Sequence, residues 1–226
     1  MRRTLYALFL ALLVGLAAPS AAKADPIEFT LQGVNDPSLS ASVLMTYNAS
    51  LGQLSLDITN TSASYDPRLT GFAFNLPLQV LGISSFSSSL GGWSYSYDRN
   101  DIDTPGQFGL YDAAGLTGPN FNGGSPNLGI AIGSSASFLF RFSGLFLNTL
   151  NEDSFASLTS YDAVGGPNES EQSFIARFQR VGSNGNGSDV AIPTQVNRVP
   201  EPSSLLLSGI GFLGLAMRRR LSPRKS

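Results

Sequence analysis

The densest group of oxygen-bearing side chains is Asp98-Arg99-Asn100-Asp101-Ile102-Asp103. Carboxylates and amides at such spacing are the ligands that a calcium ion takes in proteins. The EF-hand pattern needs glycine at its sixth position and glutamate at its twelfth, where this sequence has Asp103 and Gly109. We therefore favour a solvated loop between two strands over a calcium site, and we assign no metal ion and no cofactor.

Paired carboxylates are the second candidate chemistry. Glu152-Asp153, and Glu169 with Glu171, are acids of the kind that glycoside hydrolysis uses when two of them stand about 5–9.5 Å apart in a cleft. Both sets lie in polar, turn-like stretches, so a carboxylate-based glycoside hydrolase is the least favoured function. The sequence has no histidine and no cysteine, which excludes Ser-His-Asp and Cys-His catalysis and the usual zinc sites. We expect a protein that is not an enzyme.

Three aromatic residues at alternate positions, Trp93, Tyr95 and Tyr97, could form a platform on which sugar rings stack. Packing against a core explains the same spacing, because alternate side chains of a strand share one face. We favour core packing here. A carbohydrate-binding module remains the alternative function.

The segments around these residues repeat a period of two. Apolar and polar residues alternate through Leu54–Thr59, Phe72–Leu76, Trp93–Asp98, Phe138–Phe142 and Phe174–Phe178, separated by clusters of glycine, proline, asparagine and aspartate. This pattern is typical of antiparallel strands with one buried face. It predicts an all-β fold, an antiparallel β-sandwich or jelly-roll-like single domain over residues 25–181.

The two ends of the chain differ from this body. Residues 1–24 read as a secretory signal peptide, with a charged start, an apolar stretch and a cleavage site whose small residues are Ala22 and Ala24. Residues 182–198 begin with Gly182-Ser183-Asn184-Gly185-Asn186-Gly187-Ser188 and are expected to be a flexible linker, with at most an edge strand at Val190–Ile192. Residues 199–226 form a tail with its own chemistry.

The charges of the chain are segregated. Residues 25–199 hold six arginines against 15 of the 16 acidic residues, a net charge of −9, while five basic residues lie in the tail. An acidic body argues against nucleic acid as a partner.

The tail has three parts in fixed order. Val199-Pro200-Glu201-Pro202 is an extended rod, because each proline restricts itself and the residue before it. The apolar run 203–217 follows as a single transmembrane helix of roughly 22 Å, short against a hydrocarbon core of about 30 Å. Arg218, Arg219 and Arg220 then form a basic flank, which would stay cytoplasmic and place the body outside that membrane.

This order resembles the PEP-CTERM protein-sorting signal, over about residues 199–221. The resemblance implies recognition of Pro200, Glu201 and Pro202 by exosortase, a multi-pass, transpeptidase-like membrane enzyme of Gram-negative bacteria that make exopolysaccharide. It implies export across the inner membrane, temporary anchoring there, and then a place on the cell surface or outside the cell. We expect a structural or adhesive component of the exopolysaccharide-associated biofilm matrix.

Overall fold

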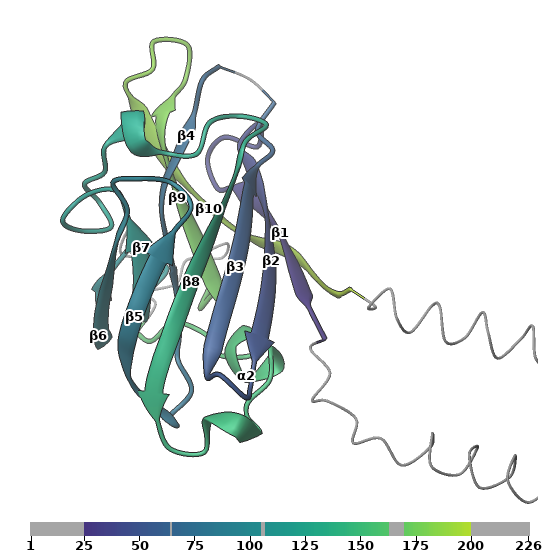
Figure 1. The fold of residues 1–226 in the computed structure, drawn as a ribbon. Helices are drawn as coiled ribbons and strands as arrows, with labels where there is room; N and C mark the ends of the chain where they lie inside the picture. The colour runs from purple at the N-terminus through teal and green to yellow at the C-terminus, as the bar shows by residue number, and fades with distance from the viewer. Residues whose placement is uncertain (1–24, 64, 105–106, 163–169, 200–226) are drawn as a thin grey trace, which may run out of the picture.

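Within residues 25–63, 65–104, 107–162 and 170–199, which the computed structural model describes, ten strands pair in one antiparallel sheet (Figure 1). Their order across the sheet is β5-β8-β3-β2-β1-β10-β9-β4-β7-β6. The elements are β1 (Ile27–Gly33), β2 (Ser40–Asn48), β3 (Gln53–Asn60), β4 (Arg68–Phe74), β5 (Val80–Ser88), β6 (Ser94–Asp103), β7 (Leu110–Leu116), η1 (Pro126–Leu128), β8 (Ser135–Gly144), η2 (Leu147–Thr149), α2 (Asp153–Ala156), β9 (Phe174–Val181) and β10 (Gly187–Arg198).

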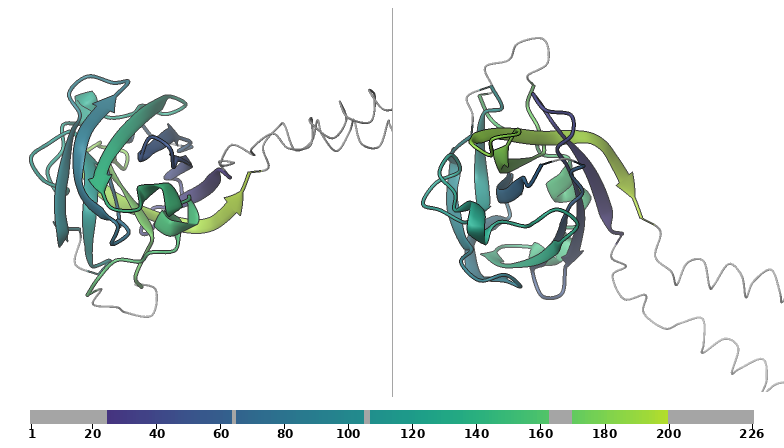
Figure 2. Two further views of the ribbon diagram at one scale, coloured as in Figure 1. Left: turned by 60° about the horizontal axis from the view of Figure 1, so that its bottom comes forward. Right: turned by 90° about the horizontal axis from the view of Figure 1, so that it is seen from above.

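The sheet curls around one axis until its edge strands, β5 and β6, come close together, which makes it a nearly closed barrel (Figure 2). Side chains bridge the seam between these two strands. The Tyr97 hydroxyl donates to the Leu81 carbonyl at 3.0 Å, and the Arg99 guanidinium donates to the carbonyls of Pro77, at 3.0 Å, and Val80. The predicted all-β, antiparallel single domain is confirmed. One continuous sheet, however, replaces the two separate sheets of the predicted sandwich.

The period of two places phenylalanines inside the barrel. Buried and solvent-facing residues alternate along β2 and β8, as predicted. Phe72 lies among the buried rings, with centroid distances of 4.7 Å to Phe138 and 5.9 Å to Phe174. A Cβ atom on Gly115, its neighbour across the β4–β7 ladder, would lie 2.3 Å from the Phe72 ring. The packing therefore requires glycine at position 115.

Three strands depart from this alternation because both of their faces are covered. β4, β7 and the first half of β9 are buried on successive residues. Their outer faces form a second apolar cluster, in which Ala73, Tyr111 and Ile175 pack with the loop residues Phe108 and Phe121. Continuous burial on two faces gives an unbroken apolar run rather than an alternating one.

The predicted flexible linker at 182–198 is wrong from residue 187 onward. Gly187–Arg198 is β10, which pairs with β1 on one side and with β9 on the other, so it is an interior strand and not an edge. Pro193 is accommodated where the register with β1 shifts, beside Leu31, because a bulge tolerates a residue without an N–H group. Only 182–186 form a turn, with Gly182 and Gly185 at positive φ.

Residues 145–158, which we call the end cap, fold across one end of the barrel. Phe155 packs on Tyr47 with 5.0 Å between ring centroids. The buried Glu152 carboxylate accepts a hydrogen bond from the Tyr47 N–H at 2.9 Å, and the Tyr47 hydroxyl donates to the Leu147 carbonyl at 2.9 Å. The end cap is therefore fixed to β2 by apolar and polar contacts together.

The interior position of β10 predicts that a charged substitution in this strand will destabilise the domain. Ala191 is fully buried between β1 and β9, so Ala191→Asp should destabilise the domain by about 3–5 kcal/mol, because a buried unpaired carboxylate has no compensating partner. Ser183→Asp, in the exposed turn, is the control and should change the unfolding free energy by less than about 0.5 kcal/mol. Chemical denaturation checks both values. Equal stability of the two variants would contradict the assignment of an interior strand.

Candidate functional site

The acidic segment Asp98–Asp103 lies within β6, where it bulges out of the ladder with β7 between Tyr97 and Ile102. Asn100 adopts a left-handed conformation there, with φ 51°. In the described part of the chain, no three acidic side chains, here or elsewhere, are grouped as metal ligands would be. The segment instead depends on a carboxylate from the neighbouring strand.

That carboxylate is Asp112, which sequence reasoning missed. It is 4 % exposed and accepts hydrogen bonds from the N–H groups of Leu76 and Asn100, each at 2.9 Å. It also pairs with Arg99 at 3.5 Å. A single aspartate inside the apolar run of β7 was the available signal, since a buried carboxylate must have donors around it. Asp112 organises the fold.

Asp189 has the same role on the other side of the domain. It is 5 % exposed and accepts hydrogen bonds from the N–H groups of Asn35 and Asp36 at 2.9 Å, and from the Asn35 side-chain amide at 2.8 Å. The turn after β1 is thereby fixed to β10.

The acids proposed for glycoside hydrolysis are held apart by different partners. The Glu152 carboxylate is buried and accepts a hydrogen bond from the Tyr47 N–H. The side chain of the neighbouring Asp153 is exposed and forms a salt bridge with Arg198. Glu171 accepts a hydrogen bond from the Thr159 hydroxyl at 2.8 Å. Glu169 lies outside the described residues. The described acids therefore do not converge on one cleft.

The three alternating aromatic residues have three different environments. The Trp93 ring packs on Phe138 at 4.6 Å, and its Nε1 donates to the Leu128 carbonyl at 3.0 Å. Tyr97 donates across the seam, as described above. Tyr95 is 43 % exposed, and its ring packs against Phe86 with 5.6 Å between the centroids. The structure thus places Trp93 against the core, which was the favoured interpretation, and not on an open platform.

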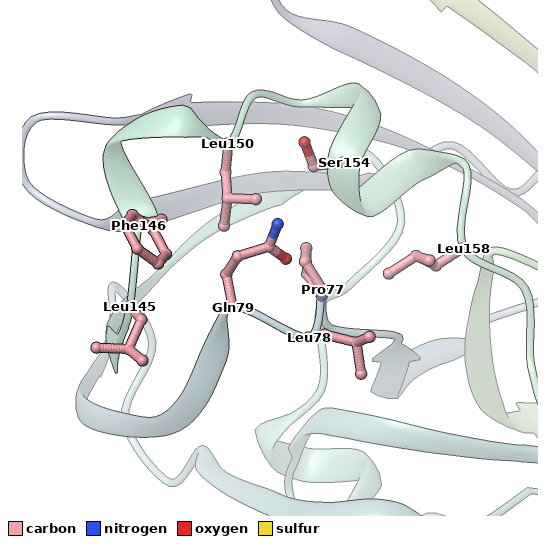
Figure 3. Close-up of a pocket in the computed structure, with 8 residues that line it drawn as sticks. All are labelled: Pro77, Leu78, Gln79, Leu145, Phe146, Leu150, Ser154 and Leu158. Atoms are coloured by element: carbon pink, nitrogen blue, oxygen red, sulfur yellow. The ribbon is translucent and has the colours of Figure 1, made fainter.

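An apolar groove of about 520 Å³ runs between the end cap and the loop before β5 (Figure 3). Three of its side chains are strongly exposed: Leu78 at 85 %, Leu145 at 63 % and Phe146 at 72 %. Gln79 and Ser154 supply the polar atoms of the lining, and no lining residue carries a charge. We call this surface the apolar groove. Sequence reasoning missed the apolar groove, because single exposed leucines in loops are common.

A polar hollow of about 550 Å³ lies at the opposite end of the barrel, beside the turn between β9 and β10. It is formed by Tyr65, Asp66, Arg180 and residues 182–186. Asp66 forms salt bridges with Arg68 at 3.0 Å and with Arg180 at 3.1 Å. The hollow therefore combines an exposed aromatic ring, amides and a paired acid and base.

The residues predicted for sorting lie outside the described residues. These are Ala22 and Ala24, the motif Pro200, Glu201 and Pro202, and the basic flank Arg218, Arg219 and Arg220, together with the predicted transmembrane helix. What the structure does show is where the chain leaves the domain. The N–H of Val199 donates to the Pro26 carbonyl at 2.8 Å, so the first and last described residues are neighbours. No helix within the described ranges is long and apolar enough to span a bilayer.

The end cap makes a prediction about alkaline pH. Burial raises the pKa of Tyr47 to about 12, above its value of about 10 in an unfolded chain. The protonated hydroxyl therefore contributes stability that is fully present below about pH 10 and is lost as the pH rises toward about 12. Tyr47→Phe should cost about 1 kcal/mol at neutral pH, through the lost hydrogen bond, and should flatten the alkaline decline.

Denaturation curves at a series of pH values measure that decline. Tyr95→Phe, at an exposed position, is the control and should keep the wild-type slope. A Tyr47→Phe slope as steep as that of the wild type would contradict the assignment.

Comparison with known proteins adds one finding, which concerns the tail. Residues 198–220 match the family model described as the PEP-CTERM protein-sorting motif. No curated protein and no solved structure matches the chain. The match begins at Arg198, the last residue of β10. The chain therefore carries a PEP-CTERM sorting motif directly behind its folded domain, which marks it as an exported, cell-surface substrate of exosortase.

Proposed function

We propose that this protein is a structural or adhesive component of the exopolysaccharide-associated matrix of a Gram-negative bacterium. The observation that carries the proposal is the position of the sorting motif, which starts where the last strand of an all-β domain ends. The domain crosses the inner membrane behind a signal peptide, is held there briefly by the tail, and is then released by exosortase to the surface.

The proposed role is one of binding and scaffolding, without catalysis. The support for this role is that the buried acidic residues of the domain accept hydrogen bonds from its own backbone. Asp112, Glu152 and Asp189 are all buried and all accept hydrogen bonds from backbone N–H groups. These three carboxylates stabilise irregular segments around the sheet through those hydrogen bonds.

Intact-mass analysis of the protein from cells with and without exosortase tests the sorting. We expect residues 1–24 to be absent from both samples, and the segment after Pro202 to be absent only where exosortase is active. Glu201→Ala should retain the tail, because it removes the charged residue of the motif. Glu171→Ala, an exposed acid in the body, should be processed normally. A tail that persists in wild-type cells would contradict the proposal.

The polar hollow favours a second candidate function, a carbohydrate-binding module. Tyr65 is 58 % exposed beside Arg180 and Asp66, and sugars are bound by such combinations of an aromatic face with polar groups. In this candidate function the sugar would bind at the polar hollow and not at Trp93, because the Trp93 ring packs against the core.

Binding of the exopolysaccharide by variant domains tests this candidate. Tyr65→Ala should weaken the affinity by about tenfold through loss of the stacking surface, whereas Tyr161→Ala, a 54 % exposed tyrosine outside the hollow, should not change it. Calorimetry or co-sedimentation gives both values. Equal affinities of the two variants and the wild type would exclude the hollow as a sugar site.

A further inference from the structure

The apolar groove lies next to the place where the chain leaves the domain. One turn of helix, α2, separates the two. Ser154 of α2 lines the groove, while the preceding Asp153 forms a salt bridge with Arg198, the last residue of β10. Arg198 also pairs with Asp25 at 3.1 Å. The exit point is therefore fixed to the end cap, on the same turn of helix that lines the groove.

The tether that follows is short. Five residue steps join Arg198 to Ser203, where the apolar run of the tail begins, and an extended chain covers at most about 17 Å in that many steps. While the tail is in a membrane, the end of the barrel that carries the groove is thus kept near the lipid surface. A second domain of this size, with a radius of gyration of about 16 Å, would not fit between the groove and that surface.

The groove has the chemistry that an interfacial lipid site requires. Leu78, Leu145 and Phe146 project from two adjacent loops, with no charged residue in the lining (Figure 3). Phe146 has φ 56°, a conformation that is unfavourable for a bulky residue. Its carbonyl accepts hydrogen bonds from both the N–H and the hydroxyl of Thr149, at 3.0 and 2.7 Å. The Phe146 ring is therefore exposed on a backbone in an unfavourable conformation. Such local strain is often found at binding sites, which points to a binding role for this side chain.

We propose that the apolar groove docks on the outer leaflet of the anchoring membrane before the tail is cut. Leu78, Leu145 and Phe146 enter the boundary between head groups and acyl chains, about 5–10 Å deep. Docking orients the barrel with its polar hollow away from the lipid and presents the sorting motif at the depth where a membrane enzyme works. This inference rests on the proposed function, since it needs the tail as an anchor.

A single-cysteine experiment on the full chain tests the docking, because the natural sequence has no cysteine. Asn148→Cys, exposed in η2 beside the groove, and Ser183→Cys, exposed at the far end of the barrel, each receive an environment-sensitive fluorophore. The labelled chains are reconstituted into vesicles of phosphatidylethanolamine and phosphatidylglycerol with brominated acyl chains. Flotation of the vesicles reports anchoring, and quenching of the label by bromine reports docking.

We expect both chains to float, with strong quenching at position 148 and little at position 183. Adding Leu145→Glu and Phe146→Glu to the Asn148→Cys chain should lower the ratio of docked to undocked molecules by roughly tenfold or more, because each substitution places a charge where docking would transfer an exposed apolar side chain into the lipid. Tyr65→Glu in the same background is the matched control and should leave the quenching unchanged. Thermal melting of each variant confirms that the fold is retained.

The outcomes separate this inference from the proposed function. Chains that do not float contradict the anchor itself, and with it the docking. Chains that float with equal, weak quenching at both positions contradict the docking alone. A label at position 148 that is shielded from aqueous iodide but is not quenched by brominated lipid would show that a protein surface covers the groove, which also overturns the lipid assignment.

Discussion

The salt bridge between Arg99 and Asp112 is the contact on which closure of the sheet depends. A ten-stranded sheet needs a ladder between its edge strands to become a complete barrel, but among the residues described β5 and β6 are not paired, and Arg99 lies where β6 bulges out of its ladder with β7. Arg99 replaces the missing ladder by donating to carbonyls of the loop before β5, while Asp112 neutralises it and accepts from the N–H groups of Leu76 and Asn100. The Asp112 side chain is buried and that of Arg99 is partly buried, and such a pair stabilises the fold when its hydrogen-bonding groups are used. The surrounding carbonyls and N–H groups meet that requirement, so the seam closes without backbone pairing.

Strands such as β8, which face both core and solvent, were predictable from sequence because their apolar residues alternate with polar ones. β4 and β9 were predictable because their phenylalanines alternate with smaller or polar residues, although both faces are covered along β4 and along the first half of β9. β10 was not. Its residues 189–191 are buried in succession and its residues 194–198 are exposed in succession, so neither stretch alternates. This one strand also decides the architecture. Without β10, the order divides into β5-β8-β3-β2-β1 and β9-β4-β7-β6, which are the two sheets of a sandwich. The sorting motif was predictable because its order is local, whereas the apolar groove and the polar hollow combine loops that are distant in sequence.

The two ends of the barrel have opposite character. The apolar groove and the chain exit share one end, and the polar hollow occupies the other. The end cap and the turn between β9 and β10 create this polarity, since neither contributes to the ladders that form the barrel. The same sheet could therefore carry different end loops without a change in its ladders. Both proposed binding surfaces lie in the loops that close the two ends.

The interior position of β10 has a mechanical consequence. Any tension on the tail enters the domain at Arg198 and runs along a strand that pairs with β1 over residues 191–198 and with β9 over residues 187–191. Such a pull loads two ladders in shear, so that many hydrogen bonds resist together instead of opening one after another. The N–H of Val199 bonded to Pro26 places the opposite terminus beside the point of load. A domain that is tethered through an interior strand should therefore resist unfolding when a pulling force acts on its C-terminal end.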